Sequence, residues 1–156
     1  MDDPGAEQRS LFRRWPAGVS VVVAELGGRR HGLTVSSLVS LSLEPPLVGI
    51  SIAKQASLHE LLRDAGRWAA SILSGDQEEL AQHFARSVPP LVLWDGIGVR
   101  DDDPRLIAGA AGWLTAHTVH EVEAGDHTFF VAEVESVEEG TAATSLSYVH
   151  RGYVAL

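Results

Sequence analysis

Alternating and continuous apolar segments recur along the chain and predict mainly β structure. Residues 39–44 (Val-Ser-Leu-Ser-Leu-Glu) alternate apolar and polar side chains, the period of a strand with one apolar face and one hydroxyl-bearing face. We expect this strand over residues 34–44, because Pro45 and Pro46 then remove two donors from any ladder. Residues 47–53 follow as a second, almost continuous apolar strand.

Other apolar segments predict most of the remaining strands. These are expected over residues 19–24, from 29 onward, and over 68–73, 111–122, 128–138 and 145–155. Strands without a regular alternation of strand and helix favour an antiparallel barrel over a doubly wound sheet. The fold is therefore expected to be a mainly β, antiparallel barrel with two or three short helices. All 156 residues are expected to form one domain.

The short helices are predicted from amphipathic patterns and capping signals. An amphipathic helix over residues 6–15 is expected to bring Leu11, Phe12 and Trp15 into the core. Ser57 has capping-box spacing to a glutamate three residues later and opens a second predicted helix.

A third helix is expected after Asp76, with this aspartate as its N-cap. Residues 86–105, rich in proline, glycine and aspartate, are expected to form a long irregular loop.

Composition excludes several classes of function. The formal net charge is −9 and Lys54 is the only lysine, so no basic patch for nucleic acid is expected. The absence of cysteine excludes disulfides, thiolate nucleophiles and zinc–thiolate sites. No apolar segment approaches the ~20 residues of a membrane span, and the acidic start, Met-Asp-Asp-Pro, does not resemble a secretory signal. We therefore expect a soluble, cytoplasmic protein.

A cluster of hydroxyl groups is the first candidate for binding chemistry. Its members fall within nine residues: Thr34, Ser36, Ser37, Ser40 and Ser42. Neutral donors and acceptors of this kind can line a wall for a flat ligand with polar edges, without adding charge. Ser57 lies at the start of a predicted helix, where free backbone N–H groups favour a phosphate.

Three other patterns resemble catalytic or metal-binding motifs but lack a residue or a geometry that those motifs need. His59 and Glu60 begin like a zinc-protease motif, but Arg63 replaces the second histidine. Ser51 lies inside an apolar strand, so a serine hydrolase is not expected. His117 and His120 are three residues apart on a predicted strand, on opposite faces, so no shared metal is expected there.

Five segments in the same order resemble the short-chain flavin reductases. The segment 32–48 (Gly-Leu-Thr-Val-Ser-Ser to Pro-Pro-Leu-Val) resembles their signature, and residues 12–23 resemble their opening segment. Residues 76–85, 125–128 and 148–153 are similar to the second helix, the Gly-Asp-His turn and the C-terminal aromatic–basic segment of the family. Ser71 and Ala116 depart from the usual Asn and from a common Cys.

This resemblance implies an FMN-binding split barrel that acts as an NAD(P)H:flavin oxidoreductase. The cofactors carry the hydride chemistry, and the expected ligands are FMN or FAD together with NADH or NADPH. The family commonly supplies reduced flavin to a partner monooxygenase. It often builds the flavin site across two subunits, which implies a homodimer.

The resemblance also assigns candidate residues. His127 is implied to lie beside the nicotinamide as the catalytic residue. The implied cofactor-binding residues are Thr34, Ser36, Ser37, Ser40, Ser42, Ser51, Ile52, Ala53, Ser57, Leu58, Phe84, His150, Arg151 and Tyr153. For His150, Arg151 and Tyr153 a solvated chain end is an equal alternative, and for Phe84 a place in the core.

Two other functions stay open on sequence grounds. A split-barrel flavoprotein could retain its flavin and act as an oxidase, although the chain lacks the dense basic cluster that a dianionic substrate would need. A flavin-binding module without enzymatic activity is the second alternative. Turnover of NADH with and without added flavin separates these readings.

Overall fold

The computed structural model describes residues 3–156 as antiparallel sheets with three helices. The larger sheet has the strand order β3-β2-β6-β7-β8-β5-β4, and the smaller one has the order β1-β9-β10. The strands of the larger sheet are β2 (Ser20–Leu26), β3 (Arg29–Val35), β4 (Val39–Leu43), β5 (Pro46–Ala53), β6 (Arg67–Ile72), β7 (Gly112–Ala124) and β8 (His127–Glu139). The strands of the smaller one are β1 (Ala17–Gly18), β9 (Leu146–Val149) and β10 (Gly152–Ala155). The predicted mainly β, antiparallel fold is confirmed.

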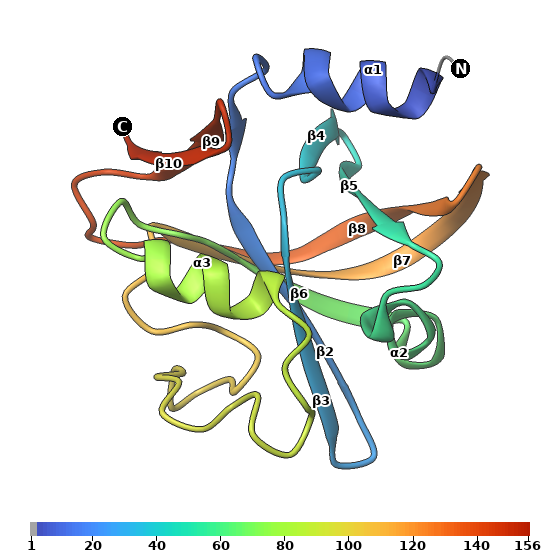
Figure 1. Cartoon of the computed structure of the whole chain (residues 1–156). Coiled ribbons are helices and arrows are strands. Elements are labelled where there is room, and N and C mark those ends of the chain that lie inside the picture. The colour runs from blue at the N-terminus through green and yellow to red at the C-terminus, as the bar shows by residue number, and fades with distance from the viewer. Residues whose placement is uncertain (1–2) are drawn as a thin grey trace.

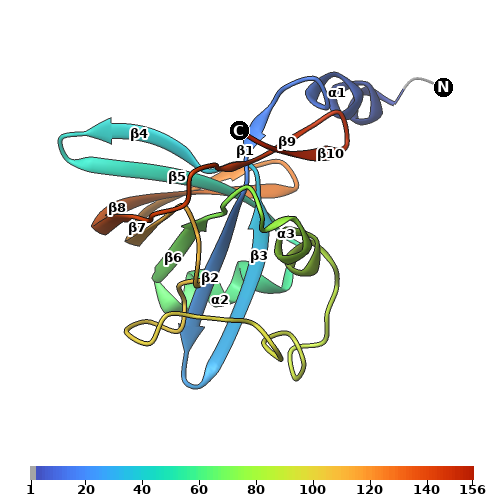
Figure 2. The same cartoon turned by 90° about the vertical axis from the view of Figure 1, so that its left-hand side faces the viewer.

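Strand β2 is buried on both faces and separates two cores. Val22 and Ala24 belong to a core that α2 (Ser57–Ala65) covers, and Val21 and Val23 belong to a second core under α3 (Glu78–Ala85). Figures 1 and 2 show the curved larger sheet with the two helices at different places around it. Burial on both sides explains why this strand is a continuous apolar run rather than an alternating one.

Two predicted strands are divided in the structure. The strand expected over residues 34–44 breaks after Val35 and resumes as β4, and the one expected over 145–155 is the β9–β10 hairpin. His150 and Arg151 form the turn of this hairpin with φ of 52° and 62°. Two successive positive φ values match the turn that suits the twist of a two-residue hairpin.

The N-terminal helix does not enter the core, contrary to the expectation from its pattern. Helix α1 (Pro4–Phe12) starts at Asp3, whose side chain accepts a hydrogen bond from the Ala6 backbone N–H, and it has no buried residue. Leu11, Phe12 and Trp15 are 64%, 57% and 68% exposed. Figure 1 shows α1 lying at the top of the molecule, beside the β9–β10 hairpin. Within residues 3–156, these three side chains therefore stay largely open to solvent.

Both predicted side-chain N-caps are wrong. Helix α2 has Ala56 at its N-cap, so Ser57 is the first helical residue, and no side chain caps this helix. Helix α3 has Gln77 at its N-cap, also without a capping side-chain hydrogen bond. Asp76 instead accepts a hydrogen bond from the Ser74 hydroxyl, because the chain makes a tight turn before α3 begins.

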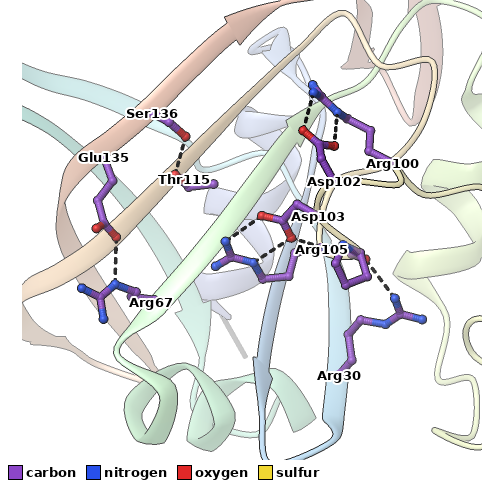
Figure 3. Close-up of polar contacts among 10 residues, drawn as sticks. Arg30, Arg67, Arg100, Asp102, Asp103, Arg105, Thr115, Glu135 and Ser136 are labelled. Atoms are coloured by element: carbon purple, nitrogen blue, oxygen red, sulfur yellow. Dashed lines mark hydrogen bonds and ion pairs between the residues drawn. The ribbon is translucent and has the colours of Figure 1, made fainter.

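The long loop over residues 86–105 is irregular, as predicted, but is fixed to the sheets. Arg100 pairs with Asp102 and with Glu138 of β8, and Asp103 pairs with Arg105 at 2.7 Å. Figure 3 shows these two arginine–aspartate pairs. The buried Ser71 hydroxyl accepts a hydrogen bond from the Ile107 N–H at 2.9 Å. The departure at Ser71 thus anchors the segment that follows the loop.

Candidate functional site

Four of the predicted site residues lie on or beside the pair of strands β5 and β8. The Ser37 hydroxyl donates to the Ser51 backbone carbonyl and accepts from the Ser51 N–H, both at 3.0 Å. Strand β5 then pairs with β8, so that Ala53 lies opposite His127. The structure therefore brings Ser37, Ser51, Ala53 and His127 together, although they are up to 90 residues apart.

Two of the hydroxyls hold the fold together. Thr34 Oγ1 donates to the Ala81 carbonyl of α3 at 2.6 Å, and the Ser37 proton is used by Ser51. Neither O–H is free to donate to a ligand, although each oxygen can still accept. Thr34 and Ser37 stay predicted cofactor-binding residues, with their oxygens as acceptors rather than their O–H groups as donors.

Three other predicted binding residues have buried side chains. Ile52 and Leu58 pack in the core under α2, and Phe84 packs in the core under α3. Phe84 also lies in aromatic contact with His83 and Trp94. Their side chains cannot contact a ligand without repacking a core, so only their backbone atoms remain for binding.

The remaining hydroxyls face outward and are available. Ser36, Ser40 and Ser57 are exposed, and Ser42 is half-buried next to the irregular register of β4 and β5. Because α2 has no side-chain cap, N–H groups in its first turn are open to an anion from outside the chain. Ser57 therefore keeps its predicted chemistry even though it is not the N-cap.

A pocket of ≈ 660 Å³ joins the hydroxyl segment to both ends of the chain. We call it the N-terminal pocket; its lining includes Arg13, Trp15, Ser36, Ser37, Tyr148 and Arg151. The His150 N–H donates to the Arg13 carbonyl at 2.6 Å, which holds the β9–β10 turn against the N-terminal segment.

Arg13, Trp15 and Tyr148 are lining residues that sequence reasoning did not select for binding, although all three lie within segments that resemble the family. The Tyr153 ring contacts the Tyr148 ring at a tilted angle of 59°, with ring centroids 5.0 Å apart, and burial raises the pKa of the Tyr153 phenol. Tyr153 therefore supports the pocket wall rather than forming it.

His127 lies at the start of β8, where it is partly exposed. Its Nδ1 is 2.7 Å from Asp126 Oδ1, and this hydrogen bond lowers the pKa of the Asp126 carboxyl. A carboxylate that accepts from Nδ1–H leaves Nε2 of the ring as the atom that can meet a ligand. Asp126 therefore orients the imidazole that sequence analysis selected.

His59 is a second histidine beside the site, and its role was missed. It is buried, and its Nε2 lies 2.7 Å from Thr128 Oγ1 of β8, next to His127. Its Nδ1 lies 3.0 Å from Glu60 Oε1. This histidine joins α2 to β8, and residues 3–156 contain no cluster of ligands for a metal.

The available groups fit a flavin nucleotide. The N-terminal pocket lies within the range of about 300–1,000 Å³ that small-molecule sites occupy. It combines aromatic walls with hydroxyls and arginines. A phosphate could meet the uncapped first turn of α2 near Ser57.

No helix in the described part of the chain is long and apolar enough to cross a membrane.

Known proteins with the same fold have flavin chemistry. A solved structure of an NADH:FAD oxidoreductase from Streptomyces globisporus C-1027 superposes with a TM-score of 0.91 at 32% identity, covering 100% of this chain and 96% of that one. The reductase component of 4-hydroxyphenylacetate 3-monooxygenase from Thermus thermophilus is 36% identical over 145 residues, which are 93% of this chain and 92% of the relative.

Another relative is named for FMN instead of FAD. An NADH:FMN oxidoreductase from Rhodococcus erythropolis is 34% identical over 151 residues, covering 94% of this chain and 78% of the relative. The family described as "Flavin reductase like domain" matches residues 12–156. Because this match spans nearly the whole chain, as does the similarity to the relatives, the protein belongs to the flavin reductase family.

Proposed function

We propose that the protein is an NAD(P)H:flavin oxidoreductase that reduces FMN or FAD. The family match over residues 12–156 carries this proposal. The contacts that bring Ser37, Ser51, Ala53 and His127 together support it. When bound, a flavin supplies the acceptor for a hydride from reduced nicotinamide. The protein itself needs no nucleophile for this reaction, and its task is to hold the two rings in contact.

The exposed hydroxyls and the backbone of β5 hold the flavin. Ser36, Ser40 and Ser42 border the ring site, and the backbone of Ser51 to Ala53 runs along it. Ser57 and the first turn of α2 hold the phosphate, because this helix has no side-chain cap of its own. Most of these contacts are neutral, which suits a flavin that must leave after reduction.

His127 positions the nicotinamide. Asp126 accepts from its Nδ1–H, which would leave Nε2 to meet the carboxamide of a bound nicotinamide. His150 and Arg151, in the β9–β10 turn, belong to the flavin side of this proposal, since Arg151 lines the N-terminal pocket with Ser36. Positive φ at both residues keeps this turn tight.

Two copies of the chain form a homodimer. Leu11, Phe12 and Trp15 on the α1 segment are exposed, as are Val39, Leu41 and Leu43 of β4. Large exposed apolar patches of this kind mark interaction sites in soluble proteins. A second copy that covers them would also complete the N-terminal pocket, because Phe12 and Trp15 line it.

The reduced flavin passes to a partner monooxygenase in the cytoplasm. Relatives named as reductase components of two-component monooxygenases support this part of the proposal. No bound partner is required for the reduction itself, since the flavin is the carrier.

Steady-state oxidation of NADH and of NADPH tests the proposal. The purified protein is assayed without flavin, with FMN and with FAD. Turnover that requires added or bound flavin is expected. A flat NADH and NADPH signal at saturating FMN and FAD would refute the reductase, whereas flavin binding without turnover would indicate a flavin-binding module. Flavin-dependent oxidation of a different bound substrate would indicate an oxidase.

A further inference from the structure

One hydrogen bond in the described part of the chain joins two side chains that are both buried, and it lies next to His127. It connects His59 Nε2 of α2 with Thr128 Oγ1 of β8 at 2.7 Å, and the two residues are 5% and 6% exposed. An apolar pair of similar shape could fill this position at little or no cost in stability. What the polar pair adds is direction, because a hydrogen bond holds its two partners in one mutual orientation.

The imidazole of His59 is itself fixed in place. The buried leucines of α2 anchor this helix in the core. The His59 ring packs edge-on against Phe130, with ring centroids 5.6 Å apart and an angle of 63° between the planes. Its Nδ1 lies 3.0 Å from Glu60 Oε1. The helix, the aromatic contact and the carboxylate therefore all restrict how this ring can turn.

Glu60 also sets the direction of the hydrogen bond to Thr128. A carboxylate only accepts hydrogen bonds, so the contact with Glu60 requires the proton on Nδ1 of His59. In the neutral imidazole, Nε2 then carries no proton and accepts from the Thr128 O–H. The Thr128 side chain is thereby held in the one rotamer that aims its hydroxyl at His59.

Thr128 and His127 are coupled through the start of β8. Burial alternates along this strand, so Thr128 faces the core while His127, one residue earlier, faces the opposite side. His127 also lies at the end of the ladder, opposite Ala53 and Ala124 beside the hairpin turn. A rotation of this strand end about its own axis moves both side chains. An anchored Thr128 therefore fixes the direction in which the imidazole of His127 points.

The other polar side-chain contacts of this region do not provide the same anchor. Arg63 pairs with Glu121 at 3.1 Å, and Lys54 pairs with Glu123 at 3.5 Å. Both glutamates belong to β7, and both pairs are open to solvent, where ion pairs contribute little. The hydrogen bond to Thr128 is the polar side-chain contact of α2 that reaches β8.

We propose that His59 is a positioning residue for hydride transfer, which fixes, through Thr128, the orientation in which His127 meets the nicotinamide. Helix α2 is the fixed end of this contact because its apolar face is buried. The start of β8 is the end that is held in place. The inference rests on the proposed flavin reductase function and on the place given there to His127.

The double variant His59→Leu with Thr128→Val separates positioning from packing, because it replaces the polar pair with an apolar pair. Its free energy of unfolding and its Kd for flavin should stay near those of the wild type. The value of kcat/KM for NADH, from stopped-flow reduction of flavin-saturated protein, should fall about 2- to 13-fold. A stable double variant with wild-type kinetics would leave a packing role alone and overturn the proposal. Weakened flavin binding at unchanged hydride transfer would overturn it too.

Two single substitutions test the same hydrogen bond without a change on α2. Thr128→Ser keeps the hydroxyl and should keep hydride transfer near the wild-type rate, whereas Thr128→Val should lower it. Equal rates in these two variants would overturn the proposal. Thr118→Val is the matched control, because it removes a hydroxyl of β7 that accepts from Trp68 Nε1–H at 3.3 Å. Hydride transfer in this control should stay at the wild-type rate.

A double-mutant cycle shows whether the effect passes through His127. In the His127→Ala background, Thr128→Val should cause no further loss of kcat/KM for NADH, because no imidazole remains to be positioned. A further loss as large as that in the wild-type background would overturn the proposal, as would a wild-type rate in His127→Ala itself. Absence of flavin-dependent NADH oxidation in the wild-type protein would count against the proposed function instead, so the two failures are distinguishable.

Discussion

At the scale of single residues, flavin binding and nicotinamide positioning are assigned to different side chains. Ser57 lies at the uncapped start of α2, while His127 lies across the β5–β8 pair and is oriented by Asp126. The two groups act on different parts of the assembled site. Substitutions should therefore separate binding of flavin from use of NADH.

The variant His127→Ala should impair use of NADH while leaving flavin affinity nearly intact. Loss of one positioned hydrogen bond predicts a fall of about 2- to 150-fold in kcat/KM for NADH. Ser57→Ala is the matched variant and should weaken flavin binding with little change in hydride transfer at saturating flavin. Stopped-flow reduction of bound flavin, beside flavin titration, measures both effects. Loss of flavin affinity in His127→Ala at an unchanged reduction rate would contradict the assignment.

His31 makes stability depend on pH. Burial lowers the pKa of this imidazole below its ordinary value of 6.5 in the folded state. The unfolded chain therefore binds the proton more readily, so the free energy of unfolding is fully retained above pH 6.5 and falls as the pH drops below it. Urea unfolding at pH 7.5 and pH 5.5, two values on either side of about 6.5, measures the free energy of unfolding at each pH. The difference between the two free energies should be smaller for His31→Gln than for the wild-type protein. An equal difference in both proteins would contradict this account.

The role of a residue could be predicted from the sequence only where the groups that define this role lie nearby in the sequence. The hydroxyl cluster and His127 could be selected from the sequence, because their motifs are contiguous. That Thr34 donates to Ala81 of α3 and Ser37 to Ser51 could not, because these partners lie across the fold. The hydrogen bond between His59 and Thr128 could not be predicted either, because these two residues are far apart in the sequence.

At the scale of elements, β5 lies in a crowded interior. Gly49 pairs with Val39 of β4 and Val131 of β8. A Cβ atom at this position would overlap the Phe129 ring. The glycine is therefore required by close approach rather than by its φ angle.

The variant Gly49→Ala should destabilise the protein by about 1–3 kcal/mol, the cost of overpacking. Gly98→Ala is the control, since a Cβ there would meet only Ala108 at an ordinary contact distance of 3.7 Å. Urea denaturation measures both free energies of unfolding. Equal stability of Gly49→Ala and the wild type would show that Phe129 yields without cost.

Element type was predictable where hydrophobic periodicity was strong. Most strands follow from it, because burial of one or both faces dictates the pattern, and the three helices that the patterns and capping signals predicted all occur. The break at His150–Arg151 depends on positive φ angles at two residues that are not glycine. At the break over residues 36–38, the Ser37 hydroxyl is hydrogen-bonded to the Ser51 backbone of β5, a distant partner. Helix α1 was predicted to enter the core because its pattern is amphipathic, but the pattern does not say whether the apolar side chains pack within the chain, and in the structure they are exposed.

At the scale of the whole molecule, the single chain leaves large apolar side chains of β4 and of the α1 segment exposed to solvent. Leu43 is 89% exposed on β4, and the α1 segment adds further apolar side chains. A homodimer that covers both would bury a continuous surface, and such interfaces usually exceed about 1,000 Å².

The variant Leu43→Asp should shift the protein from dimer to monomer, because a desolvated carboxylate at an interface is costly. Val137→Asp, at a similarly exposed position on β8, is the control and should remain a dimer. Light scattering at micromolar protein measures the mass. A fully active wild-type protein with the mass of one chain would rule out the dimer.

Anaerobic mixing of the protein with flavin and NADH tests the central claim most directly. Without oxygen, the yellow colour of oxidised flavin disappears only when hydride has been transferred. The account predicts that the protein accelerates this bleaching far above the rate of free flavin with NADH, for FMN or FAD. Bleaching at the rate of the protein-free mixture, for both flavins and for NADPH as well, would contradict it.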